Sequence, residues 1–507
     1  MQESAKELVD KPQVEERTTL QRTLQPHWVW AIALGSAIGW GAFVQPITWM
    51  GTAGPLGVII GFSIGALLMM LIAVSYGILI KSFPVSGGEF AYAFLSLGRT
   101  HAFISGWFLT LGYICIVALN ASAFALMLKY VFPPIIENVR LYTIAGWDIY
   151  IMEIIAATLI LAIFGYANIK GTGLSGRMQF AFACIMVIAV VGLTLSVGMQ
   201  PGAGLSNVQP LFPANKTAFA AIISIVAIAP WAYVGFDAVP QASEEFNFPA
   251  RKAFMLIIYA LLFAAILYSL MILATAMVRP WQNVASENHL WGTGFVIQEL
   301  LGPIGLAVLV IALCMGIFTG LNGFTLAGSR LLFAMGRAKI LPSAFEKVHP
   351  KYKTPYVAIL FTICIAALAP WFGREALVWV VDMSSIGVSI AYFYACFTAY
   401  FLFKWSKNDV NLNPKLHIVS PFRKLIAAIG ALASLIFIGL LLIPGSPAFL
   451  GIQSRIALFV WVILGVVVYL IKRKEFHQIA EQKLNYLILG SEEIVSKEYE
   501  ELKLDKN

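Results

Sequence analysis

Charged residues are scarce in this chain. Of its 507 residues only 12% are charged and 60% are hydrophobic, whereas an ordinary soluble domain is about 25% charged and about 45–50% apolar. This composition is typical of an integral membrane protein and excludes a soluble enzyme, a disordered chain and a nucleic-acid-binding protein. The net charge of +8 therefore has to be interpreted by position before it can suggest a polyanionic partner.

Cysteine and histidine are too few and too scattered for a metal centre. The five cysteines all lie inside apolar runs, which argues against a disulfide framework and a zinc site. The six histidines lie at predicted helix ends, in loops or in tails, and the predicted helices contain no His pair, acid pair or nucleophile–base spacing. No nucleotide-binding loop is present. We therefore expect no enzyme activity, no metal, no cofactor and no ATP-driven pumping by this chain alone.

Long apolar runs are abundant. A membrane-spanning helix needs roughly 20 mainly apolar residues, and twelve runs meet this requirement. They are too long for barrel strands, so the sequence predicts an all-α integral membrane protein. The predicted spans cover 28–49, 56–81, 102–131, 149–169, 178–199, 218–243, 253–279, 303–333, 355–372, 376–404, 424–443 and 454–472.

The basic residues predict the orientation of these spans. Lys and Arg are retained on the cytoplasmic side during insertion, and 28 of the 34 fall on one side if both termini are cytoplasmic. The positive charge is then a topology signal and implies no nucleic acid. The first 27 residues mix acidic and basic side chains without a separate short apolar region, so no cleavable signal is expected.

The spans divide the chain into five parts. These are a cytoplasmic N-terminal tail (1–27), a ten-helix core (28–404), a cytoplasmic loop (405–423), two further helices (424–472) and a cytoplasmic C-terminal tail (473–507). The C-terminal tail is charged. It is interpreted as a solvated tail, with a surface helix around Ile479, Leu484, Leu487 and Ile488 as the alternative.

Two spans carry residues that interrupt helices. The first contains Gly39 and Gly41 at mid-membrane, which indicates either close helix packing or a break. The sixth contains Pro230 followed by Gly235, a combination that favours a broken helix. Broken helices are tolerated in lipid where their freed backbone lines a cavity or meets a ligand. Two breaks, each in the first helix of a five-helix set, are typical of inverted-repeat transporters.

The motifs around these breaks resemble the amino acid–polyamine–organocation (APC) permeases. They are the glycine-rich first span, WAYVGFD at 231–237, PVSGGEFAY at 84–92, and SRLLFAMGR at 329–337 followed by Leu341-Pro342 and Thr354-Pro355. Together they cover about residues 27–404. The resemblance implies a leucine-transporter-like fold with a 5+5 inverted repeat (about 28–199 and 218–404), broken helices 1 and 6, and alternating access.

The two breaks offer complementary groups to a substrate. Freed N–H groups around Ile38, Gly39, Trp40 and Gly41 suit a carboxylate, and freed carbonyls at Trp231, Ala232 and Val234 suit an ammonium group. In similar permeases these segments hold the α-carboxyl and α-amino groups. The resemblance also implies that the Trp231 ring closes over the substrate and that Asn120 faces it. Interior packing remains the alternative for Trp231, as does hydrogen bonding to a neighbouring helix for Asn120.

Coupling candidates are the polar side chains inside the spans. Asp237 lies just past the sixth-span break, where it could exchange protons, bind a substrate amine or hydrogen-bond the broken backbone. Thr319 and Asn322 form a polar stripe with Thr325, for which structural hydrogen bonding is the alternative. Some proton-coupled relatives carry a lysine in helix 5 where this chain has Met186, so proton coupling through an acid, sodium coupling and exchange without a driving ion all stay open.

The remaining membrane acids have structural interpretations. Glu153 and Asp382 lie near outer helix ends and are expected to reach water. Glu244 and Glu245, at the inner end of helix 6, are expected to pair with Arg251 or Lys252.

The sequence thus predicts a multi-pass permease of the plasma membrane that moves an amino acid, with a neutral or apolar side chain favoured. The candidate pocket residues include one acid and no base. The partners expected are this small molecule, the lipid bilayer, and H+ or Na+ as coupling ion in symport or antiport. A polyamine or ethanolamine carrier is the first alternative, and a non-transporting nutrient sensor is the second. The oligomeric state stays open.

Overall fold

The computed structural model describes residues 17–144, 146–287, 289–373, 375–405 and 421–490. Nine helices in these residues are long and apolar enough to cross a membrane. The chain is therefore a multi-pass helical membrane protein. These nine helices are α3 (Pro46–Ser82), α4 (Gly88–Val131), α6 (Ile151–Ile169), α7 (Thr172–Gly198), α11 (Ala253–Ala276), α13 (Gly292–Arg337), α15 (Glu375–Trp405), α16 (Pro421–Leu442) and α17 (Ile452–Gln478).

Three of the twelve predicted runs consist of shorter pieces. The first run holds α1 (Pro26–Ile38) and α2 (Gly41–Val44). The sixth holds α8 (Ala218–Val226), α9 (Ala229–Ala232) and α10 (Ala238–Gln241), and the ninth holds α14 (Tyr356–Ala366) and a 3-10 turn. The helix is thus interrupted at both places where the sequence predicted a break. Short helices outside the runs are α5 (Pro133–Ile136), α12 (Trp281–Ser286) and α18 (Glu481–Leu489).

Three helices start ten or more residues before the predicted spans, and α3 is one of them, with a bend at Gly54, whose φ is 69°. The spans expected at 102–131 and 303–333 belong to α4 and α13, which have 44 and 46 residues. Each helix bends at a glycine with positive φ, Gly98 at 77° and Gly302 at 66°. Because glycine adopts this conformation without steric cost, a short helical segment runs into the longer one at an angle. The spans were predicted to start near residues 102 and 303, which lie just after these bends. The helices themselves begin earlier.

The sequence prediction missed one short element that is not helical. Strands β1 (Arg140–Ile144) and β2 (Trp147–Tyr150) form an antiparallel hairpin between α5 and α6. The hairpin helps to bury an ion pair of Lys129 and Glu153, 2.9 Å apart, with the Trp147 and Tyr150 rings 4.6 and 4.5 Å from the Lys129 Nζ. The expectation that Glu153 reaches water is therefore wrong, since its side chain is only 6% exposed.

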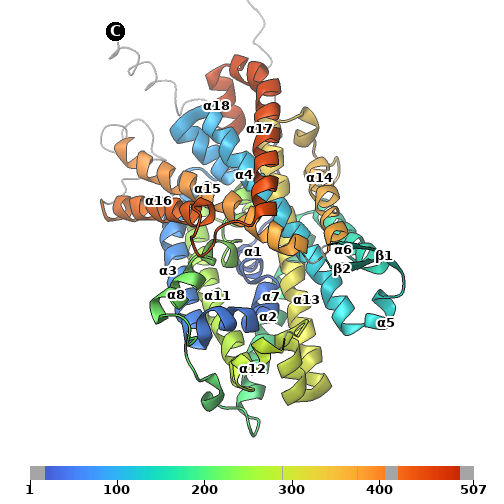
Figure 1. Cartoon of the computed structure of the whole chain (residues 1–507). Helices are drawn as coiled ribbons and strands as arrows, with labels where there is room; N and C mark the ends of the chain where they lie inside the picture. The colour runs from blue at the N-terminus through green and yellow to red at the C-terminus, as the bar shows by residue number, and fades with distance from the viewer. Residues whose placement is uncertain (1–16, 145, 288, 374, 406–420, 491–507) are drawn as a thin grey trace, which may run out of the picture.

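The breaks of the interrupted helices are buried in the core, although α8 lies at the edge of the molecule in Figure 1. Helix α1 packs against α7, α11 and α13, and α8 packs against α3 (Figure 1). Helix α17 lies at the edge, and its exposed apolar side chains, such as Ile456, Phe459 and Leu470, suit contact with lipid tails. We call the side that carries α18 and residues 17–25 the terminal side. Helix α12 lies at the opposite end of the molecule (Figure 1).

Candidate functional site

The first interruption leaves backbone donors free. Helix α1 ends at Ile38, and Gly39 has φ 53° and ψ −155°, outside any helical conformation. Trp40 then begins a new turn as the N-cap of α2. Within the described residues, the N–H groups of Trp40 and Gly41 donate to no other atom. These two N–H groups are available to an acceptor such as a carboxylate.

The second interruption lies directly against the first. Residues 233–237 separate α9 from α10, and Gly235 has φ 131°. A Cβ atom at Gly235 would lie 2.5 Å from Cβ of Ser36 and 2.7 Å from N of Ala37. Only a residue without a side chain allows this approach, so the two broken segments form one site in the core of the molecule.

A tyrosine that the sequence reasoning missed joins the two breaks. The hydroxyl of Tyr268, on α11, lies 3.1 Å from the Ala37 carbonyl, 3.2 Å from the Ile38 carbonyl and 2.9 Å from the Ala232 carbonyl. Its one hydroxyl hydrogen is shared among three acceptors, which leaves acceptor capacity at these oxygens for another donor. Tyr268 lies in an apolar helix with no motif around it, and no sequence signal marked its role.

Aromatic rings cover one face of this site. The Trp231 ring lies over Gly41, where an added Cβ would be 2.8 Å from it, and packs edge-on against Trp40 and Trp49 with centroids 6.2 and 6.4 Å apart. The Nε1 of Trp40 is buried without a partner in the described part of the chain. Of the predicted substrate residues, the structure gathers Ile38, Gly39, Trp40, Gly41, Trp231 and Ala232 at the breaks, with Val234 buried beside Gly235.

A cavity of about 770 Å³ reaches this site from the side opposite the terminal side. Trp40 is among its lining residues, and most of the others come from the start of α3, the end of α4, the segment from α12 to the start of α13, and the start of α15. The lining is mainly apolar, with Gln45, Thr48 and His289 as polar members. The cavity therefore leads from the α12 end of the molecule toward the broken helices.

Asn120 lies near the first break, and glycines of α13 contact both of them. Its amide fills the space at Gly320, where an added Cβ would be 2.7 Å from the Asn120 Nδ2, and the nearby Gly316 packs on the Gly39 carbonyl. The Asn120 Nδ2 donates to the Ile116 carbonyl at 2.8 Å, whereas Oδ1 is buried with no partner among the described residues. The NH₂ group of this side chain therefore has a structural role, whereas its oxygen, Oδ1, can accept a hydrogen bond from another molecule.

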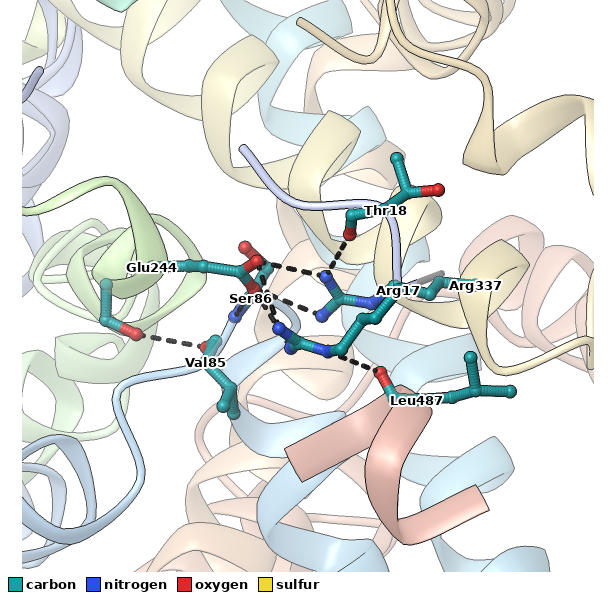
Figure 2. Close-up of polar contacts among 8 residues, drawn as sticks. Arg17, Thr18, Val85, Ser86, Glu244, Arg337 and Leu487 are labelled. Atoms are coloured by element: carbon teal, nitrogen blue, oxygen red, sulfur yellow. Dashed lines mark hydrogen bonds and ion pairs between the residues drawn. The ribbon is translucent and has the colours of Figure 1, made fainter. Parts of the chain in front are cut away.

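Ion pairs close the terminal side. The Glu244 carboxylate binds both terminal nitrogens of Arg337 at 3.1 Å and those of Arg17 at 3.3–3.4 Å, and it accepts from the Ser86 N–H at 3.2 Å (Figure 2). Arg337 also donates to the Thr18 carbonyl at 2.9 Å. We call Arg17, Ser86, Glu244 and Arg337 the terminal gate, because they join four segments that are far apart in the sequence.

A second buried ion pair supports the gate. Glu245 binds Nε of Arg330 at 2.7 Å, and neither side chain is more than 3% exposed. The prediction that Glu244 and Glu245 pair with Arg251 or Lys252 is wrong, since both basic residues are exposed. The 3-10 turn at Ser243–Glu245 directs the two carboxylates toward α13, which proximity in sequence could not show.

The terminal gate should be insensitive to pH near neutrality. Burial opposes ionisation, but Arg337 and Arg17 outweigh it and lower the pKa of Glu244 to about 2. A depressed pKa contributes stability above the unfolded value of about 4.5, and this stability is lost as pH falls through about 2. We therefore expect Glu244→Gln to lower the unfolding midpoint by the same amount at about pH 5.5 and about pH 7.5. A difference that shrinks markedly at the lower pH would contradict this assignment.

Comparison with known sequences identifies the family of this chain. A profile of the amino acid permease family matches residues 28–468. The chain belongs to the amino acid permease family. This is a family of the APC superfamily, so the resemblance noted in the sequence is confirmed.

Individual relatives differ in what they carry. The permease is 28% identical to the branched-chain amino acid permease BcaP of Bacillus subtilis, over 69% of this chain and 74% of the relative. It is 29% identical to the methylthioribose transporter of the same organism, over 73% and 79%. It is 26% identical to the aromatic amino acid transport protein AroP of Escherichia coli O157:H7, over 69% and 74%.

Asp237 is engaged by the backbone of the break. Its carboxylate accepts from the Gly235 N–H at 2.7 Å and from the Tyr113 hydroxyl at 2.9 Å, and the side chain is fully buried. Both bonds hold the interruption open, in line with the structural alternative for this residue. Its part in coupling stays a prediction.

The other two coupling candidates tie helices of the permease together. Asn322 makes four hydrogen bonds, to Asn168, Gln179 and two atoms of Ser175. The Thr319 hydroxyl lies 2.9 Å from the Gly35 carbonyl. These bonds join α13 to α1, α6 and α7. They favour the structural alternative, and a coupling role for either residue stays a prediction.

The C-terminal segment is not a solvated tail as far as Gly490. Helix α17 continues to Gln478, and α18 buries Leu484, Leu487 and Ile488. The predicted surface helix is present, yet its apolar face packs inward. Its Leu487 carbonyl accepts from Nε of Arg17 at 3.2 Å (Figure 2). The loop predicted at 405–423 and the chain after 490 lie almost wholly outside the described residues.

Proposed function

We propose that this permease carries an amino acid with a neutral side chain across the plasma membrane, with both termini in the cytoplasm. The observation that carries the proposal is the joined pair of helix breaks. In the described chain, the N–H groups of Trp40 and Gly41 are free. The carbonyls of Ala37, Ile38 and Ala232 share the single hydroxyl hydrogen of Tyr268 and can accept from another donor. An α-carboxylate and an α-ammonium group need these two kinds of partner a few ångströms apart. Amino acid carriers among the relatives support the same substrate class.

Alternating access is part of this proposal. The cavity opens toward α12, whereas the terminal gate and the Arg330–Glu245 pair close the other side. In this proposal, which places both termini in the cytoplasm, the combination is an outward-open state. Opening toward the cytoplasm would require the gate ion pairs to separate and the aromatic cover to close over the site.

Two parallels support a twelve-span, 5+5 inverted-repeat architecture. The two interrupted spans each begin a proposed repeat. In addition, α4 and α13, the third helix of each repeat, both bend ten residues after their first residue, at Gly98 after Gly88 and at Gly302 after Gly292. Sharing a bend at the same register is what a duplicated five-helix unit would produce.

The amine-carrier alternative is disfavoured by the engagement of Asp237. Its carboxylate is buried and already accepts from Gly235 and Tyr113, so binding a substrate amine would require breaking a bond that shapes the helix break. A nutrient sensor with the same pocket would bind amino acids without moving them, and the transport assay separates the two.

The test is uptake of labelled amino acids by proteoliposomes that contain the full chain, with pH gradient and sodium varied independently. Unlabelled amino acids and their decarboxylated amines serve as competitors. We expect neutral amino acids to compete and the amines to be ineffective. Competition by amines alone would overturn the substrate assignment, and binding without uptake would show a sensor. Ser446→Ala, in the turn that follows α16, is the variant control and should transport normally.

A further inference from the structure

A second buried carboxyl group lies next to Asp237, and neither the predicted coupling set nor the substrate site includes it. Glu89, in the first turn of α4, is fully buried. Its carboxylate accepts from the Tyr76 hydroxyl at 2.6 Å and from the Gln241 side-chain amide. Gln241 and Asp237 are four residues apart across a helical turn, so they project from the same face. Glu89 and Asp237 therefore share one buried polar site.

No cation balances these two acids in the described part of the chain. The groups that face them are tyrosines: Tyr76 on α3, Tyr92 and Tyr113 on α4, and Tyr392 on α15. The nearest basic residues of α13 are taken, Arg330 by Glu245 and Arg337 by Glu244. Two negative charges buried together without a counterion are costly in a membrane protein, so the site holds a proton.

The hydrogen-bond partners of Glu89 and Asp237 indicate which of the two acids exchanges the proton. Asp237 accepts from a backbone N–H, which can only donate and therefore favours the carboxylate form. Both partners of Glu89, a hydroxyl and a side-chain amide, can either donate or accept. The Gln241 Oε1 is buried with no partner in the described residues, so rotation of this amide by half a turn would offer an acceptor to a protonated Glu89. Glu89 is thus stabilised in both protonation states.

Glu89 is also placed between the substrate site and the terminal gate. Ser86, three residues earlier, donates its N–H to the gate carboxylate Glu244 at 3.2 Å, and Ser243 donates to the Val85 carbonyl at 3.0 Å (Figure 2). Separation of these contacts would move the start of α4 and expose Glu89 to the terminal side. Asp237, in contrast, belongs to the helix break next to Gly235.

We propose that Glu89 is the proton-binding group of this permease, loaded when the terminal gate is closed and released to the terminal side when the gate opens. The proton passes to a carboxylate oxygen of Glu89 and leaves it again as a proton, so no other bond changes. This inference rests on the proposed transport function and adds H+ as the coupling ion.

The test separates proton movement from amino acid movement in proteoliposomes. A mixture of the twenty amino acids is added outside, and internal pyranine reports proton entry. Counterflow of labelled amino acids between equal concentrations measures exchange without net proton transfer. We expect Glu89→Gln to lose proton entry and gradient-driven accumulation while counterflow stays within about twofold of the parent protein, because the uncharged amide mimics protonated Glu89.

Asp382→Asn is the matched control. This acid on α15 accepts from Ser454 at 2.6 Å and lies outside the buried site, so the variant should keep normal proton entry. Undiminished proton entry in Glu89→Gln would overturn the proposal, as would equal loss of counterflow and accumulation in a folded variant. If Glu89→Gln does not fold, Tyr76→Phe carries the test: we expect the pH midpoint of uptake to shift by about half a unit or more, and an unchanged midpoint would overturn it.

The parent protein distinguishes this inference from the proposed function. Absence of amino acid movement under every gradient would remove the proposed function itself. Amino acid movement that ignores the pH gradient would leave that function intact and overturn only the role of Glu89.

Discussion

Replacement of Gly235 by alanine is expected to reduce transport to the level of empty liposomes. The new Cβ would lie 2.5 Å from Cβ of Ser36 and 2.6 Å from its carbonyl carbon, and part of this obstruction is backbone that cannot rotate away. The φ of 131° adds backbone strain for any residue with a side chain, of order 1–3 kcal/mol. The two breaks would be forced apart, and the groups expected to bind the substrate would move with them.

Uptake and thermal unfolding of the purified variant check this prediction. Gly192→Ala is the matched control, because an added Cβ at this position of α7 meets no described atom within 4 Å beyond the adjoining backbone of its own helix. It should transport like the parent protein and be at least as stable, since alanine favours helix over glycine by about 1 kcal/mol. Normal uptake by Gly235→Ala would mean that the close approach of the breaks is dispensable.

Removal of one partner of the Arg330–Glu245 pair is expected to cost far more stability than removal of an exposed charge. Both side chains are almost fully inaccessible, so Arg330→Met leaves a buried carboxylate without a counterion. Such losses are typically about 3–5 kcal/mol. We expect a large fall in the unfolding midpoint in detergent, together with a weakened terminal side, since the Glu245 carbonyl also accepts from the Thr23 and Leu24 N–H groups.

An exposed pair serves as the comparison. Arg279 lies 2.7 Å from Glu287 and 3.3 Å from Glu299, and all three side chains are at least a quarter exposed, so Arg279→Met should cost about 1 kcal/mol or less. The double variant Arg330→Met/Glu245→Gln should recover part of the loss, because it removes the unpaired charge. If the double variant is less stable than Arg330→Met alone, the cost comes from packing and the electrostatic explanation fails.

Features that depend on local chemistry could be predicted from the sequence. Apolar length marked the spans, and Gly39, Pro230 and Gly235 marked the two interruptions, because loss of helix at these residues follows from their own backbone properties. The small residues around the first break also predicted a site, and the structure places most of the proposed substrate residues there.

Features that depend on how distant helices meet could not be predicted. Tyr268 reaches both breaks, yet its helix has no polar pattern around it. Glu89 was part of a recognised motif, but its burial next to Asp237 follows only from the packing of α4 against α10. The partners of Glu244 come from residues 17 and 337, whereas distance along the chain favoured the basic residues at 251 and 252.

The contact of Arg17 with the Leu487 carbonyl has a consequence for biosynthesis. These residues are 470 positions apart, so the chain cannot complete the terminal side until α18 has emerged from the ribosome. Until then Arg17 lacks one of its hydrogen-bond partners. A fusion added after residue 490 must leave α18 free to dock, or every copy of the protein will be made without this final closure.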